Sequence, residues 1–215
     1  MELLKQIAET LQQGEDKRTA ELTKQAVAAG TPAKEILDHG LVAGMNRVGE
    51  LFRDQEIFLP DVLLAARAMY AGLDVIKPLL LRDKVEPLGR VVIGTVQGDL
   101  HDIGKNLVGI MLRGAGFDVI DLGNDVAPER FVDAAVKEGA QVIGLSALLT
   151  TTMPVMKRVC DLVAGRNLRG RVKVVIGGAP VTAEYARQIG ADAYGFDAAA
   201  AVDAVKRLLL PQNRH

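Results

Sequence analysis

One turn of the chain, GDLHDIG, holds His101 between Asp99 and Asp102, with Gly98 and Gly104 on either side. His101 is one of only three histidines in the sequence. A carboxylate two residues from an imidazole can accept one ring proton, which fixes the tautomer and raises the basicity of the other ring nitrogen. Glycines allow the backbone to come close to a large ligand. The turn therefore has the chemistry of a histidine prepared to bind a ligand.

Several kinds of site could use such a histidine. A solvated or helix-capping histidine is the commonest case, and a glycine-rich turn before a helix can bind phosphate. However, the turn has neither a Walker pattern nor GxGxxG, and its carboxylates would repel phosphate. A zinc site needs three or four ligands, and the other histidines are His39 and His215, far away in the sequence. A single imidazole better suits a metal whose other ligands come from a macrocycle.

The first half of the chain, residues 1–85, has apolar residues at helical spacing throughout. Gly30 is typical of a helix end, and Thr31-Pro32 is typical of a capping residue followed by the first helical position. We predict four helices, the fourth over residues 61–81, and an antiparallel bundle as their arrangement.

The second half, predicted as a domain over residues 90–215 after a linker at 84–89, alternates β-branched runs with helical stretches. We expect strands at 90–95, 118–123, 141–146, 173–178 and 191–196, and helices at 103–115, 128–138, 153–165, 182–189 and 198–210. Such alternation indicates a doubly wound, flavodoxin-like parallel sheet of five strands covered on both faces. Ligands bind beyond the carboxyl ends of these strands, which is where His101 and Ser146 are expected.

Composition limits the class of protein. The chain has 215 residues, 49% of them apolar, and a net charge of −1, which argues against a nucleic-acid-binding surface. No apolar run approaches the ~20 residues that span a membrane. The single cysteine, Cys160, excludes an internal disulfide and favours a reducing compartment. We therefore expect a cytoplasmic protein that binds neither nucleic acid nor membrane.

The His101 turn resembles the D-x-H-x-x-G signature of cobalamin-binding domains, which continues with S-x-L and then G-G. Here 41 residues separate Gly104 from Ser146-Ala-Leu148, and 28 more separate Leu148 from Gly177-Gly178. This three-part spacing fits the family. The resemblance implies that the cofactor is cobalamin or a related corrinoid.

The helical half carries a second resemblance. MNRVGELFRDQEIFLPDVLLAARAM, residues 45–69, is similar to the helical cap of cobalamin-dependent methionine synthase and of small corrinoid proteins in anaerobic methyl transfer. The whole chain is thus similar to the stand-alone corrinoid proteins that serve methanol, methylamine or aryl-ether methyltransferases.

The resemblance implies a role for each matching residue. His101 would be the lower metal ligand, replacing the cofactor's own dimethylbenzimidazole in a base-off, His-on state. Asp99 would hydrogen-bond His101, and the hydroxyl of Thr152, six residues beyond Ser146, would continue this catalytic relay. Ser146 and Thr150 match positions that contact the displaced nucleotide tail.

The remaining residues that the resemblance assigns to cofactor binding lie in both halves. They are Gly98, Leu100, Asp102, Ile103, Gly104, Leu148, Gly177, Gly178 and Ala198 in the second half, and Phe52, Leu59 and Val62 in the cap. The three cap residues match positions over the upper face of the corrin. Without the family match, their spacing would indicate ordinary bundle core.

The implied function is that of a corrinoid methyl carrier whose turnover needs partner subunits. It would accept a methyl group on cobalt(I) from a donor-specific methyltransferase and pass it to a second methyltransferase, for transfer to tetrahydrofolate or coenzyme M. A reductive activator would be a third partner, and the cap would swing aside for each exchange. The alternatives are a subunit of an adenosylcobalamin isomerase, a cobalamin sensor, and a plain flavodoxin-like binding module.

Overall fold

The computed structural model describes residues 2–210, so His215 and the predicted end of the second domain lie outside the described residues. The described chain forms two compact units. One unit consists of residues up to 86 together with 114–116, and the other of 87–113 and residues from 117 onward. The first is a helical bundle and the second a doubly wound parallel sheet, which confirms the predicted fold class.

The helical unit contains the four predicted helices, the third of which changes its hydrogen-bond pattern along its length. Its elements are α1 (Glu2–Gln12), α2 (Asp16–Ala28), α3 (Ala33–Glu35), η1 (Ile36–Val42), α4 (Ala43–Arg53) and α5 (Leu59–Arg82). α3, the π-helical segment η1 and α4 follow one another without a break and together form the predicted third helix. Side chains at helical spacing fill the core, among them Ile7, Leu11, Leu22, Ile36, Leu41, Val48 and Ile76.

The junction between α2 and α3 confirms one predicted signal and corrects another. Gly30 has a φ of +81°, and the N–H of Thr31 donates to the carbonyl of Ala26 at 3.0 Å, as expected of a glycine that ends a helix. The predicted helix start is wrong by one residue. Pro32, and not Thr31, occupies the position before α3, and it has no side-chain oxygen with which to cap the helix.

α5 begins at Leu59, two residues before the predicted start. The missing N–H of Pro60 is tolerated there because first-turn N–H groups have no partner within the helix. The carboxylate of Asp61 accepts the N–H of Phe58 at 2.9 Å and so satisfies a donor at this end.

The second unit is a five-stranded sheet in which every neighbouring pair is parallel, in the order β2-β1-β3-β4-β5. The strands are β1 (Arg90–Thr95), β2 (Asp118–Asp121), β3 (Val142–Ser146), β4 (Lys173–Gly177) and β5 (Ala193–Gly195). The helices are α6 (Ile103–Gly114), α7 (Pro128–Glu138), α8 (Met153–Gly165), α9 (Ala183–Ile189) and α10 (Ala198–Leu209). All five strands and all five helices lie where predicted, although every strand except β1 is shorter than predicted.

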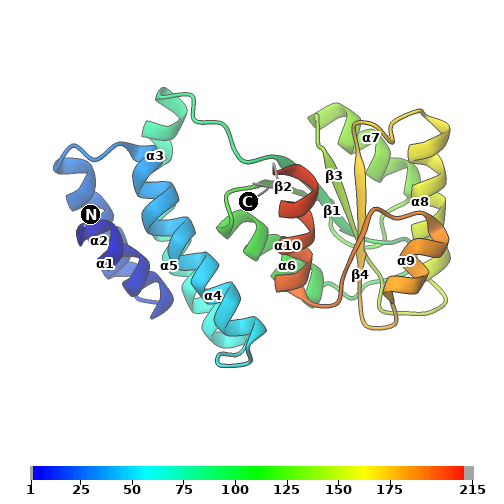
Figure 1. Ribbon diagram of the computed structural model, residues 1–215, viewed down its shortest axis with the longest axis horizontal. Helices are drawn as coiled ribbons and strands as arrows, with labels where there is room; N and C mark the ends of the chain where they lie inside the picture. Colours follow the sequence, from blue (N-terminus) through cyan, green and yellow to red (C-terminus); the bar gives the residue numbers. More distant parts are fainter. Residues whose placement is uncertain (1, 211–215) are drawn as a thin grey trace, which may run out of the picture. The chain divides into compact units, whose positions relative to one another are not determined.

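Helices cover both faces of this sheet, α7, α8 and α9 on one face and α6 with α10 on the other (Figure 1). Successive strand residues alternate between the two faces. Val92 and Ile143 belong to the buried cluster that includes Phe131 of α7. Ile93 points the other way and lies against Gly109 of α6, where a Cβ would approach its side chain to 2.8 Å. Both faces are therefore apolar, which explains the uninterrupted apolar runs in the sequence.

The strand order creates a switch point between β1 and β3, because the chain leaves β1 through α6 on one face and leaves β3 through α8 on the other. Thr95 pairs with Ser146, so the two strands end level. Residues 96–102, the His101 turn, therefore lie beside residues 147–152, the β3 turn. Among residues 2–210 no helix is both long and apolar enough to span a bilayer.

Close packing at Gly94 of β1 gives a stability prediction. A Cβ at this position would lie 2.7 Å from Cε1 and 2.9 Å from Cζ of Phe131, whose side chain is fully buried. We expect Gly94→Ala to lower the free energy of unfolding by about 1–3 kcal/mol, measured by urea denaturation. In the control Gly165→Ala, where a Cβ meets nothing within 4 Å, we expect no loss. Equal losses in both variants would contradict the packing argument.

Candidate functional site

Asp99 is the centre of the candidate site. Its side chain is fully buried, and both carboxylate oxygens accept hydrogen bonds. Oδ1 lies 2.7 Å from Nδ1 of His101 and 3.1 Å from the backbone nitrogen of the same residue. Oδ2 accepts the N–H groups of Leu148 at 2.7 Å and Leu149 at 3.1 Å, and the hydroxyl of Thr152 lies 3.0 Å away. One carboxylate thus joins the His101 turn to the β3 turn.

These contacts determine the protonation of the pair. Burial by itself raises the pKa of Asp99, but hydrogen bonds from His101, from the N–H of Leu148 and from the hydroxyl of Thr152 outweigh it and hold the pKa well below its usual range. An ionised carboxylate can only accept, so Nδ1 of the neutral imidazole carries the proton. Nε2 is then the ring nitrogen with a free lone pair. The His101 side chain is 53% exposed, so a ligand can approach it.

Thr152 fits the corner between the two turns. Its hydroxyl has one hydrogen and two acceptors within reach, the carboxylate of Asp99 at 3.0 Å and the carbonyl of Leu149 at 2.8 Å. Its methyl group lies beside Gly98, where a Cβ would be at an ordinary contact distance of 3.4 Å. The structure therefore brings Asp99, His101 and Thr152 together, with room for the methyl group that a serine would lack.

Exposed apolar side chains accompany this polar centre. Leu100 and Ile103, at the His101 turn, are 69% and 72% exposed, and Leu148 and Leu149, in the β3 turn, are 42% and 40% exposed. We call these four residues the apolar rim. Exposed apolar groups that cluster on a surface mark binding sites for ligands or partners. The rim therefore suits a ligand with a broad apolar edge.

The donor set at this site fits a metal that brings most of its own ligands. Within residues 2–210, no three His, Cys, Asp or Glu side chains are grouped as metal ligands. His101 offers one nitrogen, Nε2, while its other nitrogen is engaged by Asp99. One outward-facing imidazole inside an apolar rim agrees with a metal held by a macrocycle.

The other predicted residues of the two turns are also at this edge. The carbonyl of Asp102 accepts the N–H of Asn106 at 2.7 Å in the first turn of α6. Gly104 is exposed, and a Cβ there would meet nothing within 4 Å. Ser146 is the last residue of β3, and Thr150 is exposed in the turn that follows.

Gly177 and Gly178, at the end of β4, have a packing reason to be glycine. A Cβ at Gly177 would lie 2.9 Å from the carbonyl oxygen of Gly195. At Gly178, where φ is +124°, a Cβ would collide with the carbonyl oxygen of Ala147. Ala198, the first residue of α10, is only 6% exposed and offers little surface to a ligand. Cofactor contacts at these positions stay predictions.

The predicted cap residues lie in the helical unit. Phe52 in α4 and Leu59 at the start of α5 are partly exposed, whereas Val62 is fully buried. A contact between the side chain of Val62 and a cofactor would require a rearrangement around it. The role of all three residues over a corrin stays a prediction.

Two further residues hold the His101 turn and were not predicted from the sequence, Thr95 and Asp125. The hydroxyl of Thr95 donates to the carbonyl of His101 at 2.9 Å, and the carboxylate of Asp125 accepts the N–H of Gly98 at 2.8 Å. Asp125 follows β2, at the same edge as the other turns, so its place after a predicted strand was the available signal.

Lys105, in the first turn of α6, forms an ion pair with a neighbouring strand. Its side chain is 5% exposed, and Nζ lies 2.6 and 2.7 Å from the two carboxylate oxygens of Asp121 at the end of β2. Nζ also donates to the side-chain oxygen of Asn106 at 2.7 Å. The first turn of α6 is therefore tied to the neighbouring strand.

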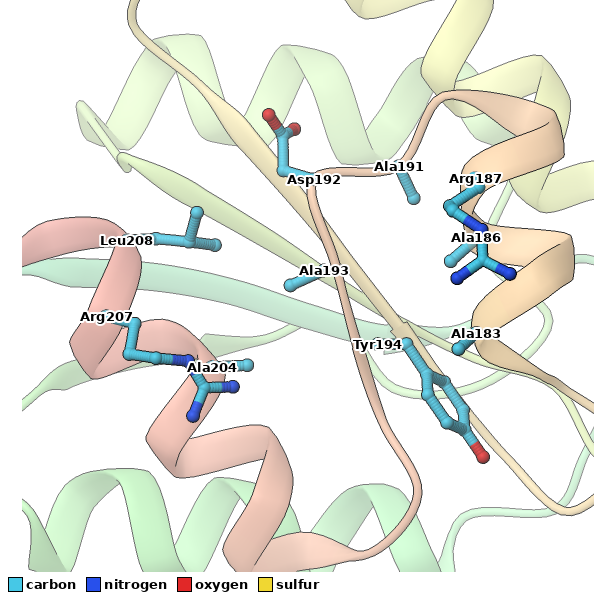
Figure 2. A pocket seen from close by; sticks show the side chains of 10 residues that line it. All are labelled: Ala183, Ala186, Arg187, Ala191, Asp192, Ala193, Tyr194, Ala204, Arg207 and Leu208. Atoms are coloured by element: carbon cyan, nitrogen blue, oxygen red, sulfur yellow. The ribbon is translucent and has the colours of Figure 1, made fainter.

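A separate hollow of 360 Å³ lies at the edge of the sheet, over β5 and between α9 and α10. Figure 2 shows the guanidinium groups of Arg187 and Arg207 on opposite sides of the β5 segment, with the ring of Tyr194 below Arg187. Much of the remaining lining is alanine, namely Ala183, Ala186, Ala191, Ala193 and Ala204. None of the predicted site residues lines this hollow.

Comparison with protein families finds two matches in this chain. Residues 89–205 match the model of a B12 binding domain, and residues 3–77 match a second model with the same description. The matches fall on the sheet unit and the helical unit respectively.

Several relatives are similar over nearly the whole chain. Trimethylamine corrinoid protein 1 of Methanosarcina mazei is 44% identical over 211 residues, covering 97% of this chain and 98% of that protein. Dimethylamine corrinoid protein 3 of Methanosarcina acetivorans is 43% identical over 208 residues, covering 97% of each.

Solved structures agree in fold. A cobalamin-binding protein from Desulfitobacterium hafniense DCB-2 is 32% identical with a TM-score of 0.80, over 95% of this chain and 97% of that chain. The methanol:cobalamin methyltransferase complex MtaBC from Methanosarcina barkeri contains a chain that is 33% identical with a TM-score of 0.86. That match covers 97% of this chain and 80% of the other.

The buried carboxylate gives a prediction about acid stability. Because the folded pKa of Asp99 is lowered, its contribution to stability is fully present above the unfolded pKa of about 3.9 and is lost as the pH falls from there toward the lower folded pKa. We expect Asp99→Asn to lower the free energy of unfolding by about 1–3 kcal/mol at pH 7, because an amide N–H₂ would face donors. Urea denaturation should show that the free energy of unfolding falls less between pH 7 and pH 3 in this variant than in the unmodified protein.

The control for this experiment is Asp74→Asn, which changes an exposed carboxylate in α5. It should keep the stability of the unmodified protein at pH 7 and its dependence on pH. An Asp99→Asn variant that behaves like Asp74→Asn would contradict the assigned charge of Asp99.

Proposed function

Because this chain belongs to the family of B12-binding corrinoid proteins, we propose that Nε2 of His101 is the lower axial ligand of the cobalt, in a base-off, His-on state. The chain binds cobalamin or a related corrinoid and serves as a corrinoid methyl carrier for methyltransferases. The observation that carries the proposal is the 2.7 Å contact between Nδ1 of His101 and the buried carboxylate of Asp99. It leaves Nε2 as the free, exposed donor.

The residues of the two turns would hold the corrinoid. The apolar rim would cover its edge, and Ser146, Thr150 and the glycine pair Gly177-Gly178 would line the groove for the displaced nucleotide tail. When bound, the corrinoid supplies the chemistry, since its cobalt can accept and release a methyl group.

Asp99 and Thr152 act on the imidazole and not on the methyl group. Asp99 holds the proton at Nδ1 and fixes the ring orientation, which keeps Nε2 basic enough to bind a metal. The hydroxyl of Thr152 helps to keep this carboxylate charged. The three residues would therefore hold the imidazole in one orientation, with Nε2 available to the metal of the corrinoid.

We infer that the methyl donor is a methylated amine. Two relatives of over 40% identity are named trimethylamine and dimethylamine corrinoid proteins, whereas the structure from the methanol system is 33% identical. A donor-specific methyltransferase would load the carrier, a second would unload it to tetrahydrofolate or coenzyme M, and a reductive activator would restore it. Movement of the cap, with Phe52 and Leu59 on it, would open the upper face to each partner.

The cytoplasm is the proposed location. This rests on the single cysteine, Cys160, which is buried and whose thiol has its pKa raised by burial to about 11. The isomerase and sensor alternatives gain no support from the relatives named above.

Replacing the proposed ligand is the direct test of axial ligation. We expect His101→Ala to bind cobalamin about 10–100-fold more weakly and to lose the absorption spectrum of a nitrogen-ligated cofactor, because the turn contains no second histidine. Titration of the apo-protein with hydroxocobalamin, followed by absorption spectroscopy, measures both.

The matched control is His39→Ala, which removes a histidine of the helical unit. It should keep the spectrum and affinity of the unmodified protein. If His101→Ala binds the cofactor with an unchanged spectrum, axial ligation by His101 is wrong.

The donor class has its own test. The loaded protein is used to capture its methyltransferase from native lysate, and the pair is supplied with trimethylamine, dimethylamine or methanol. We expect methylation of the bound cofactor with a methylated amine, detected as a change in its absorption spectrum. Methylation with methanol alone would contradict the amine assignment and leave the carrier function intact.

A further inference from the structure

We propose that Asp125 is a positioning residue for His101, because its carboxylate fixes the Gly98 pivot of the turn that carries the imidazole. This inference rests on the proposed function of His101 as a metal ligand. Asp125 lies outside the D-x-H-x-x-G, S-x-L and G-G signatures, and it belongs to the segment that follows β2.

The segment after β2 is anchored to β1 at both of its ends. The N–H of Leu122 donates to the carbonyl of Ile93 at 2.8 Å, and the N–H of Thr95 donates to the carbonyl of Gly123 at 2.9 Å. At the far end, the N–H of Val126 donates to the carbonyl of Thr95 at 3.0 Å. Residues 123–125 are therefore held at a fixed distance from the start of the His101 turn.

An ion pair between the buried Lys105 and the more exposed Asp121 fixes the beginning of this segment. Asp121 is paired with Lys105 through both carboxylate oxygens, and one of them also accepts the N–H of Gly123 at 2.9 Å. These contacts fix the backbone where the segment follows β2, and they hold Asp125 in place beside the His101 turn.

Asp125 has a backbone conformation that side-chain-bearing residues rarely adopt. Its φ is +51°, in the left-handed region, which costs a non-glycine residue free energy. Two hydrogen bonds to the His101 turn offset this cost. The carboxylate accepts the N–H of Gly98 at 2.8 Å, and the N–H of Asp125 donates to the carbonyl of Asp99 at 3.0 Å.

Gly98 is the point at which the turn most needs such support. Its φ is +85°, and a glycine at this position leaves the chain free to take many other conformations. The β3 turn holds the side chain of Asp99, whereas Asp125 holds the backbone on either side of the Gly98–Asp99 peptide. Without the carboxylate of Asp125, the turn would have to become ordered when the metal binds. The free-energy cost of this ordering would lower the affinity of His101 for the cobalt.

The variants Asp125→Gly and Asp125→Asn separate the carboxylate from the backbone conformation. Glycine accepts a positive φ without strain but has no acceptor for the N–H of Gly98. Asparagine tolerates the same φ and keeps a carbonyl acceptor. The control Asn167→Gly changes another exposed residue with a positive φ, +57°, in the turn between α8 and β4.

The first measurement uses the apo-protein and does not depend on the cofactor. We expect hydrogen exchange at the amide of Gly98, followed by NMR, to be about tenfold faster in Asp125→Gly, as for loss of one hydrogen bond. Asp125→Asn and Asn167→Gly should keep the protection of the unmodified protein. Unchanged protection in Asp125→Gly would overturn the proposal.

The second measurement uses protein loaded with cob(II)alamin, in which electron paramagnetic resonance detects an axial nitrogen. We expect the ratio of His-ligated to unligated cofactor to fall about tenfold in Asp125→Gly and to be restored in Asp125→Asn. If Asp125→Gly exchanges the Gly98 amide faster but keeps the ratio of His-ligated to unligated cofactor, the positioning role is overturned. If the unmodified protein itself lacks nitrogen ligation, axial ligation by His101 fails, and Gly98 exchange alone then decides whether Asp125 holds the turn.

Discussion

The buried negative charge of Asp99 is the constraint on which the site depends. A carboxylate taken out of water must be met by donors, and here they come from two segments about 50 residues apart in the chain, the His101 turn and the β3 turn. The sheet brings these segments together because it places β1 beside β3, with their ends level. The placement of the two turns depends on the strand order, on the apolar faces of the sheet and on the close contacts at Gly94 and Gly178.

Much of the fold could be predicted from the sequence because the relevant signals are local. β-branched runs such as RVVIGT and KVVIGG predict strands, and both are strands. The His101 turn could be located because it follows the first strand of a parallel sheet and because its spacing from Ser146 resembles that of a family. The ends of elements were less predictable, as at Pro32 and at the start of α5, since they depend on which backbone donors find partners.

The rest of the site could not be predicted because it depends on contacts between elements. The ion pair of Lys105 with Asp121 joins a helix to a neighbouring strand, and the bond of Asp125 to Gly98 joins two loops. Nothing in the spacing of these residues distinguishes them from exposed charges. Val62 matches a family position over the corrin, yet it is fully buried, as its helical spacing alone would indicate.

The hydroxyl of Thr152 has one hydrogen and two oxygens to choose between, in Asp99 and Leu149. Turning a single C–O bond moves that hydrogen from one to the other while the backbone stays still. Toward Asp99, it draws negative charge away from the imidazole; toward Leu149, it returns that charge. If His101 binds the metal as proposed, rotation of the Thr152 hydroxyl would adjust how strongly the imidazole donates electrons, although Thr152 itself would not touch the metal.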